Sequence, residues 1–267
     1  MDRDIILFDM DGTLTPPRKE LDRDLIPALR ELAKISDIGI VTGSDNNYVL
    51  QQMGLLLENS EIRYKLHILP CNGTKYYPPP QAAAHTHELA FQKNMREELG
   101  ELQFSTIMRF ILQRQAQLHL YDIPMTGHFV DYRGSMINWC PIGRNANDSD
   151  RQRFQDKDGP DSIFRLNEMK SFYTFMKRTN LEKTLTVKLG GETSFDIYPK
   201  GWDKTFALKH FEDYECWFVG DRCGHNGNDQ AIYEKLRIHG RAFEVKSTKD
   251  TLHLIFDEII PRIANSR

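Results

Sequence analysis

Short apolar runs alternate with amphipathic stretches along the first 80 or so residues of the chain. The run at residues 5–8 is continuous, as expected for a strand buried on both faces of a parallel sheet. Apolar residues then recur at helical spacing over about 22–34, and further continuous runs follow at 38–41 and 66–69. This order of strand and helix predicts parallel pairing through right-handed crossovers.

The middle of the chain has a different pattern, which begins after the triple proline at 78–80. Three prolines cannot continue a helix or a central strand, so we expect a semi-rigid hinge there. Beyond it the pattern predicts helices over 88–99, 104–117 and 164–177, strands over 128–132, 136–139, 184–189 and 195–198, and a polar loop over 145–160. Neighbouring strands grouped beside helices favour an α+β domain.

The first pattern returns after residue 202, with a predicted helix at 204–211, a buried strand at 216–219 and a helix at 229–235. The sequence therefore predicts an α/β fold with a doubly wound, Rossmann-like core. We expect this core to comprise residues 1–82 and 200–267, and the inserted α+β domain to comprise residues 83–199. We expect the chain to pass from the core into the inserted domain near residues 80–85 and to return to the core near residues 198–201.

Composition narrows the functional classes. The 267 residues are 40% hydrophobic and 27% charged, which is typical of soluble globular proteins, and the net charge of −3 argues against a nucleic-acid partner. No apolar stretch approaches the length of a membrane span, and no signal-peptide pattern is found. Cys71, Cys140, Cys216 and Cys223 are scattered, so we expect reduced thiols in a cytoplasmic protein and neither disulfides nor a zinc site.

Two carboxylates, Asp9 and Asp11, follow the first apolar run directly. Like charges this close are costly unless a cation neutralises them or one of them keeps its proton. The structural interpretation is that both only cap the turn that Gly12 permits. The functional interpretation makes Asp9 a nucleophile toward phosphorus and Asp11 a general acid and base, with Gly12 and Thr13 donating to phosphoryl oxygens.

A second polar cluster, Asp221 with Asn228 and Asp229, follows the strand predicted at 216–219. Taken singly, these residues suit a turn, Thr42 suits a helix cap and Lys204 suits the surface. Ligands of parallel sheets bind at the carboxyl ends of the strands, where Asp9, Thr42, Asn72 and the cluster of Asp221 are expected. The oxygen ligands suit Mg²⁺ better than zinc, and Lys204 would neutralise carboxylates and a phosphoryl group.

These segments resemble known motifs. Asp9–Thr13 (DMDGT), Thr42 with Gly43, Lys204, and 220–221 with 228–229 resemble the four motifs of the haloacid dehalogenase superfamily of phosphotransferases. More specifically, DMDGTLTPPR at 9–18, PIGR at 141–144, GGETSFDIYP at 190–199, GWDK at 201–204 and GND at 227–229 resemble the eukaryotic-type phosphomannomutase family. The matches run in order through nearly the whole chain.

The resemblance implies a catalytic core domain with an inserted α+β cap of the C2 type. It implies interconversion of mannose 6-phosphate and mannose 1-phosphate for GDP-mannose synthesis, with Mg²⁺ and a hexose 1,6-bisphosphate activator. Dimerisation through the cap is also implied. An Mg²⁺-dependent sugar-phosphate phosphatase on the same scaffold is the alternative. A catalytically silent binding protein is disfavoured, because the nucleophile and metal-ligand positions are all filled.

The resemblance also implies roles for individual residues. Asp9 is the phosphorylated nucleophile, Asp11 the general acid and base, and Lys204 the third catalytic residue. The implied Mg²⁺ ligands are Asp9, Asp11 (through its backbone carbonyl) and Asp221. The implied substrate-binding residues are Arg18, Thr42, Gly43, Arg133, Arg144, Arg151, Ser194 and Asp196. Lys235 departs from the family, which tends to carry an acidic residue there for a second cation.

The three arginines also have a physical rationale. They lie within 19 positions of an acidic protein, and a guanidinium grips phosphate bidentately without losing its charge. Any one of them alone would be explained by a solvated rim with surface ion pairs. Together they predict a local anion site in the inserted domain.

Overall fold

The structure is a computed structural model that describes residues 3–57, 61–83, 85–118 and 122–265. The chain divides into two compact units, Met1–Gln92 with Trp202–Arg267, and Lys93–Gly201. The first crossing therefore follows Gln92, later than the predicted 80–85. The reason is that β4 (Lys75–Tyr76) pairs with β5 (Phe91–Gln92) antiparallel, which keeps the triple proline within the first unit.

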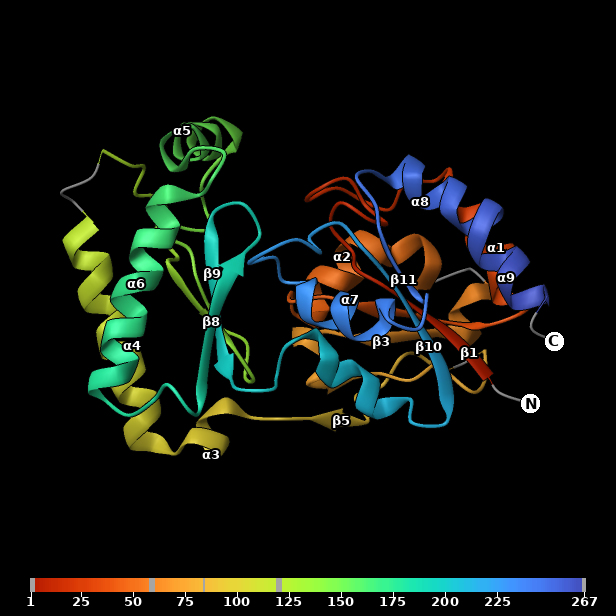
Figure 1. Ribbon diagram of the computed structural model, residues 1–267, viewed down its shortest axis with the longest axis horizontal. Coiled ribbons are helices and arrows are strands. Elements are labelled where there is room, and N and C mark those ends of the chain that lie inside the picture. Colours follow the sequence, from red (N-terminus) through yellow and green to blue (C-terminus); the bar gives the residue numbers. More distant parts are fainter. Residues whose placement is uncertain (1–2, 58–60, 84, 119–121, 266–267) are drawn as a thin grey trace. The chain divides into compact units, whose positions relative to one another are not determined.

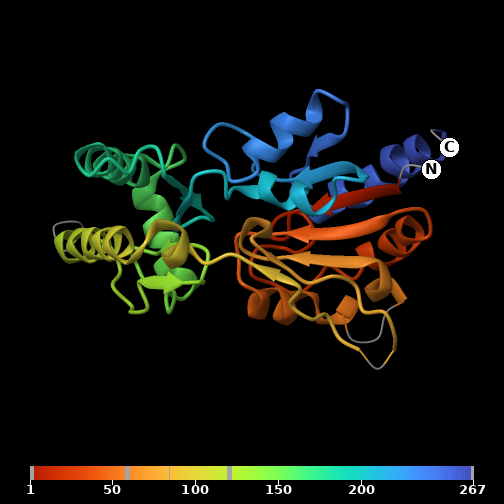
Figure 2. The ribbon, with the colours of Figure 1, turned by 90° about the horizontal axis from the view of Figure 1, so that it is seen from below.

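The first unit contains a five-stranded parallel sheet in the order β11-β10-β1-β2-β3, part of which is seen in Figure 2. Its strands are β1 (Arg3–Phe8), β2 (Asp37–Val41), β3 (Leu66–Leu69), β10 (Tyr214–Gly220) and β11 (Ala242–Glu244). Four of them were predicted, and β11 was not. Successive residues of β1 alternate between two hydrophobic clusters, with Ile6 and Phe8 in one and Ile5 and Leu7 in the other. Both faces of the sheet are therefore covered, which confirms the predicted fold class.

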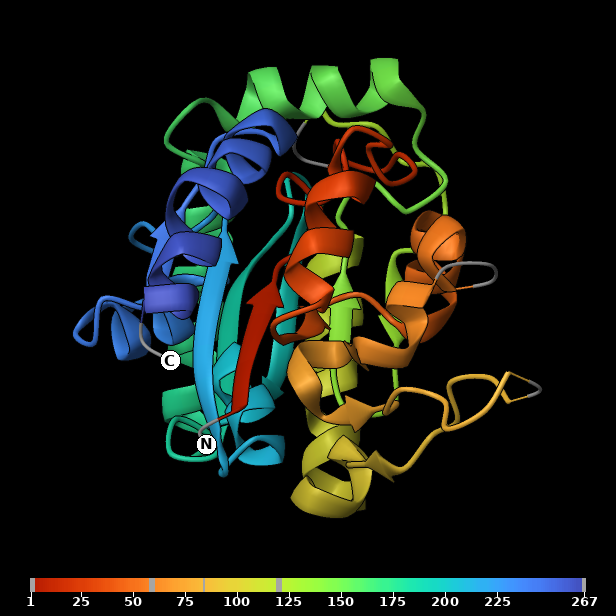
Figure 3. The same cartoon turned by 90° about the vertical axis from the view of Figure 1, so that its right-hand side faces the viewer.

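Helices cover both faces of this sheet. They are α1 (Leu25–Ala33), α2 (Asn46–Leu57), α7 (Gln230–Arg237), α8 (Thr248–Leu254), a π-helical segment (Ile255–Ile259) and α9 (Ile260–Asn265), with 3₁₀ helices at Glu61–Lys65, Cys71–Gly73 and Lys204–His210. Residues of α1, α2 and the C-terminal helices join the cluster of Ile6, while residues of α7 and of Lys204–His210 join that of Ile5. Figure 3 shows α1 and α8 beside β1 and β10.

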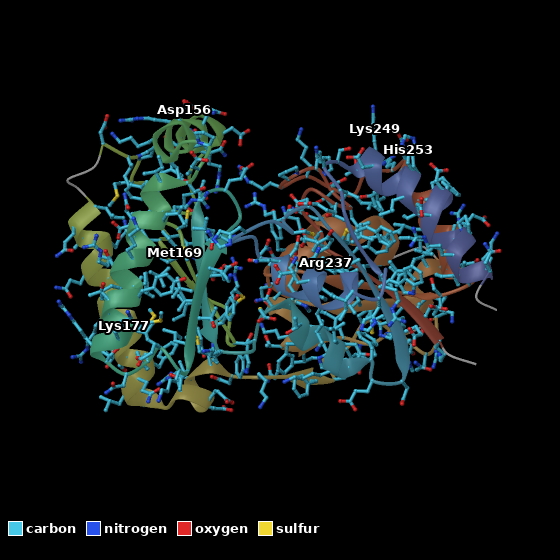
Figure 4. All side chains as sticks on the ribbon, in the orientation of Figure 1. Asp156, Met169, Lys177, Arg237, Lys249 and His253 are labelled. Atoms are coloured by element: carbon cyan, nitrogen blue, oxygen red, sulfur yellow. The ribbon has the colours of Figure 1, made fainter. Side chains whose placement is uncertain are left out.

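The second unit contains a four-stranded antiparallel sheet in the order β6-β7-β9-β8. Its strands are β6 (Val130–Tyr132), β7 (Ile137–Trp139), β8 (Leu185–Gly190) and β9 (Ser194–Pro199), and its helices are α3 (Met95–Leu99), α4 (Glu101–Gln117), α5 (Asp148–Asp158) and α6 (Ile163–Arg178). The ring of Trp139 stacks on Phe195 and contacts Phe172 of α6. Along α6, Met169 is buried and Lys177 is exposed (Figure 4). The α+β character of the insert is as predicted.

Two sequence predictions for this unit are wrong. Residues 145–160 were predicted to be a polar loop, but most of them form α5, which begins with a capping box between Asn147 and Asp150. Asp156 and most of its neighbours are exposed (Figure 4), so the helix has no apolar stripe to reveal it. The helix predicted over 88–99 begins only at Met95, because the side chain of Asn94 caps it there.

The four cysteines are free and buried. None of the helices in the described ranges combines the length and hydropathy that crossing a membrane requires.

Asp37 joins the amino ends of the core strands. Its carboxylate accepts hydrogen bonds from Arg3 (3.1 Å), Lys65 (3.0 Å) and the hydroxyl of Tyr214 (3.1 Å), and His67 lies 3.9 Å away. Burial alone would raise the pKa of Asp37, but His67 and Lys65 outweigh burial and hold it well below its usual range.

We expect Asp37→Asn to lower the free energy of unfolding by about 2 kcal/mol near neutral pH, because hydrogen bonds to a charged group are lost. A depressed carboxyl pKa stabilises the fold above the unfolded value of about 4, and this contribution is lost as the pH falls below it. The difference in the free energy of unfolding between wild type and variant, measured by urea unfolding, should therefore become smaller as the pH is lowered from about 6 to about 3. Asp24→Asn, at an exposed position, is the control. A difference independent of pH would contradict this assignment.

Candidate active site

Strand β1 places Asp9 at the carboxyl end of the core sheet. The amide of Asp9 donates to the carbonyl of Val219 at 2.8 Å, which extends the pairing of β1 with β10 by one residue. The chain then turns sharply, because the amides of Leu14 and Thr15 both donate to the carbonyl of Met10, at 2.9 and 3.0 Å. Asp9 is only 5% exposed, so its carboxylate is held in a buried position.

Gly12 lies where this turn approaches the end of β10. Its φ of +87° favours glycine, and a Cβ there would lie 2.4 Å from Oδ2 of Asp221. Any larger residue would displace the carboxylate of Asp221. Glycine is therefore required both by backbone conformation and by the close approach of the two acidic segments.

Lys204 is buried completely at the start of its 3₁₀ helix, and its ammonium donates to Oδ1 of Asp9 and Oδ1 of Asp229. The preceding backbone is held by Asn72 at the end of β3, whose side-chain amide donates to the carbonyl of Trp202 at 3.1 Å. The lysine thus connects the segments after β1 and β10. The sequence analysis placed Asp229 in a cluster of oxygen ligands for a cation and did not predict its contact with Lys204.

The same carboxylates form a candidate metal site. Asp9, Asp221 and Asp229 each offer an oxygen, and these oxygens lie within 4.8 Å of one another. Oδ1 of Asp221 and Oδ1 of Asn228 are buried with no hydrogen-bond partner among the described residues. Buried oxygen acceptors without donors are the ligands that a hard cation such as Mg²⁺ prefers, so these residues fit the ion.

The pKa shifts of these groups also favour a bound cation. Burial raises the pKa of Asp9 well above its usual value, and Asp229 and Asp221 raise it further, although Lys204 lowers it. Burial and the charge of Asp229 raise the pKa of Asp221 to about 6. For Lys204, burial lowers the pKa but the two carboxylates outweigh it and raise it. The ammonium of Lys204 bonds to only two of the three carboxylates, and the third, Asp221, has Nε of Arg222 at 3.8 Å, so a bound cation would relieve the repulsion among them.

Asp11 is not part of this cluster. Its Oδ1 accepts from the backbone amide of Arg18 at 3.0 Å, and from Tyr48 and Gln52 of α2 at 3.4 and 3.5 Å. The structure therefore brings Asp9 and Asp221 of the predicted metal set together, while the side chain of Asp11 contacts α2. Arg18 lies next to Asp11 and is exposed.

The remaining residues predicted to bind ligand in the first unit are Thr42, Gly43 and Thr13. The hydroxyl of Thr42, at the end of β2, accepts from the amide of Ser44 at 3.1 Å, and Gly43 lies between them. The hydroxyl of Thr13 is buried without a partner among the described residues, so it is available to a ligand. Lys235 is exposed on α7.

The second unit carries a cluster of the opposite charge. Nε of Arg133 lies 2.9 Å from Oδ2 of Asp131, and Nε of Arg144 lies 3.9 Å from the same oxygen. Burial lowers the pKa of Arg144, and the charge of Arg133 lowers it further. The buried guanidinium of Arg133 and the partly exposed one of Arg144 share this carboxylate, an arrangement that favours an anion.

Arg151, on α5, stabilises the loop that carries Arg144. It donates to the carbonyl of Ala146 (3.1 Å), the hydroxyl of Thr193 (3.1 Å) and the carbonyl of Arg144 (3.4 Å). These contacts give it an intramolecular role. The predicted direct contact of Arg151 with phosphate stays a prediction.

Ser194 and Asp196 lie two residues apart on β9, where alternate side chains share one face. Asn138 on the adjacent strand β7 contacts both, and its side chain was missed by the sequence analysis. A polar residue in the middle of the buried strand Ile137–Trp139 was the available signal.

Known proteins resemble this chain in sequence and in fold. A sequence profile of eukaryotic phosphomannomutases matches residues 25–260. Phosphomannomutases of Dendrobium officinale and Spinacia oleracea are each 34% identical to the chain, over 92% and 93% of its length and 90% and 92% of theirs. The chain belongs to the eukaryotic phosphomannomutase family.

Solved structures agree with a haloacid dehalogenase fold for this family member. An IMP-bound mutant of Plasmodium falciparum IMP-nucleotidase aligns with a TM-score of 0.66 at 14% identity, covering 98% of this chain and 67% of that one. A trehalose-6-phosphate phosphatase related protein aligns with a TM-score of 0.53 at 13% identity, covering 99% and 100%. At such identities the likeness concerns the fold alone.

We expect Mg²⁺ to stabilise the protein, because a ligand of the folded state adds about 2.7 kcal/mol when present at 100 times its dissociation constant. Thermal unfolding with and without MgCl₂, at ionic strength matched with KCl, measures the effect. Asp221→Asn should reduce the Mg²⁺-dependent rise in midpoint, whereas Asp257→Asn, at an exposed position, should leave it intact. An equal rise in both variants would contradict the assignment of the site.

Proposed function

We propose that this protein is a phosphomannomutase that interconverts mannose 6-phosphate and mannose 1-phosphate, with a hexose 1,6-bisphosphate as activator and intermediate. The observation that carries the proposal is the buried contact of Lys204 with Asp9, at the carboxyl end of β1, in a chain of this family. It gives a carboxylate both a fixed position and a cationic neighbour, as a nucleophile toward an anionic phosphoryl group requires.

In this proposal Oδ2 of Asp9 attacks phosphorus of a bound hexose bisphosphate. The bond from phosphorus to the sugar oxygen breaks, and Asp11 gives that oxygen a proton, releasing a hexose monophosphate. The phosphorylated Asp9 then gives its phosphoryl group to a free hydroxyl of a mannose monophosphate, whose proton Asp11 takes, so that a hexose 1,6-bisphosphate forms and Asp9 is free again. When this bisphosphate binds in the opposite orientation, its other phosphoryl group is transferred to Asp9, Asp11 protonates the leaving oxygen, and the isomeric monophosphate is released.

The neighbouring residues have supporting roles. Lys204 keeps Asp9 oriented, and the unpartnered hydroxyl of Thr13 donates to a phosphoryl oxygen. Asp9, Asp221 and the backbone carbonyl of Asp11 would hold Mg²⁺, with Asp229 beside them. When bound, Mg²⁺ supplies positive charge to the phosphoryl oxygens.

We assign the cluster of Arg133 and Arg144 to the phosphate that is not being transferred. Guanidinium groups bind phosphate in bidentate pairs and stay charged even where burial lowers their pKa. Ser194 and Asp196 are assigned to hydroxyls of the sugar. Because Asp196 is only 5% exposed, only a small part of this residue would contact the sugar.

The cellular setting belongs to the same proposal. The product mannose 1-phosphate would supply GDP-mannose synthesis in the cytoplasm. The protein would act as a homodimer formed through residues 93–201, without a nucleic-acid or membrane partner.

The defining test is a phosphorus NMR time course with mannose 1-phosphate, MgCl₂ and a hexose 1,6-bisphosphate. We expect mannose 6-phosphate to appear. Asp9→Asn should abolish its formation, and Asp24→Asn is the matched control at an exposed position. Release of free mannose and inorganic phosphate alone would replace the mutase proposal with a sugar-phosphate phosphatase on this scaffold.

Arg144→Ala should lower kcat/KM for mannose 1-phosphate by about 30-fold, corresponding to the loss of about 2 kcal/mol of charge-assisted hydrogen bonding. Hydrolysis of a small aryl phosphate, which has no second phosphate, should change little. Arg178→Ala on α6 is the control for removing an exposed guanidinium. Equal losses of Arg144→Ala on both substrates would argue against binding of a distal phosphate.

A further inference from the structure

Asn138 lies between the two sets of side chains that the proposed function assigns to phosphate and to sugar. It is 2% exposed. Its Oδ1 accepts from Nη1 of Arg144 at 2.9 Å. Its Nδ2 donates to Oγ of Ser194 at 3.0 Å and to Oδ1 of Asp196 at 2.8 Å. One buried amide therefore contacts three residues from two other sequence segments, the loop that carries Arg144 and strand β9.

The chemistry of the partners fixes the orientation of this amide. A guanidinium only donates, so the oxygen of Asn138 must face Arg144. An ionised carboxylate only accepts, so the nitrogen must face Asp196. The contact with Ser194 supports the same orientation. The hydroxyl of Ser194 donates its only proton to the carbonyl of Gly190 at 2.6 Å, so it can only accept from Asn138. Turning the amide over would break all three contacts.

The backbone around this network is equally constrained. Asn138 and Asp196 are directly opposed in the antiparallel pairing of β7 with β9, so their side chains share one face. On the next strand, a Cβ at Gly190 would lie 2.7 Å from Oδ1 of Asp196. Glycine at this position therefore leaves the space that the carboxylate occupies beside Asn138.

We propose that Asn138 is a positioning residue, whose amide sets the separation between the guanidinium of Arg144 and the carboxylate of Asp196. A hexose phosphate is then recognised as a unit, because its phosphate and its hydroxyls must match that fixed spacing. Asn138 acts through these neighbours and does not itself take part in phosphoryl transfer. The inference rests on the proposed function, since it takes the ligand to be a hexose phosphate.

The test is a double-mutant cycle read out by the dissociation constant for mannose 1-phosphate, measured calorimetrically without turnover. We expect Arg144→Ala to raise the constant about 30-fold and Asn138→Ala about 10-fold. If Asn138 acts through Arg144, the double variant should fall well short of the product of about 300-fold. Effects that multiply would overturn the proposal.

An isosteric variant separates the two sides of the amide. Asn138→Asp keeps an acceptor for Arg144 but loses the donor to Ser194 and Asp196, and it tests the proposal if Asn138→Ala fails to fold. Its effect should be non-additive with that of Asp196→Ala. Independent effects of these two substitutions would again overturn the proposal.

A buried control distinguishes positioning from loss of stability. Glu168 on α6 is also 2% exposed and is bound by Arg114 of α4 at 2.8 and 2.9 Å. We expect both Glu168→Gln and Asn138→Ala to lower the thermal midpoint, but Glu168→Gln should leave the dissociation constant unchanged. A matching loss of affinity in Glu168→Gln would show that stability alone explains the result. If the wild-type protein binds mannose 1-phosphate but only hydrolyses it, the mutase proposal is refuted. The double-mutant cycle at Asn138 can still be interpreted in that case, because it measures binding alone.

Discussion

The candidate active site depends on one ammonium group held out of water between two carboxylates. Burying Lys204 is costly unless its charge is compensated, and Asp9 and Asp229 compensate it. The same contact fixes Asp9 where β1 leaves the sheet and connects it to the segment after β10. Because Asp221 adds a third carboxylate, the compensation is incomplete, and the excess negative charge makes the site suited to a cation and to phosphoryl chemistry.

The arginine cluster of the second unit has an excess of positive charge. Arg133 and Arg144 gather around the single carboxylate of Asp131, and Asn138 connects Arg144 to Asp196 on β9. A parallel sheet supplies the first site through loops at the carboxyl ends of its strands, whereas an antiparallel sheet supplies the second through side chains on one face. Under the proposed function, the first unit would carry the chemistry at one phosphate and the second would bind the remainder of the sugar phosphate.

Sequence reasoning succeeded where one physical signal dominated. The runs at 5–8 and 66–69 are continuous because both faces of the core sheet are buried, and β1 and β3 contain them. It failed for α5, which is defined by capping and not by an apolar stripe. It also missed Asn138, because hydrogen bonds between distant segments depend on strand pairing, and the only local sign was a polar residue within a short buried strand.

The central claim is that Asp9 accepts a phosphoryl group. Its most direct measurement is mass spectrometry of protein quenched with acid after mixing with a hexose 1,6-bisphosphate and MgCl₂. The account predicts one added phosphoryl group, located by fragmentation on Asp9 and absent from Asp9→Asn. Phosphorylation at another residue, or turnover of mannose 1-phosphate without any phosphorylated protein, would contradict it.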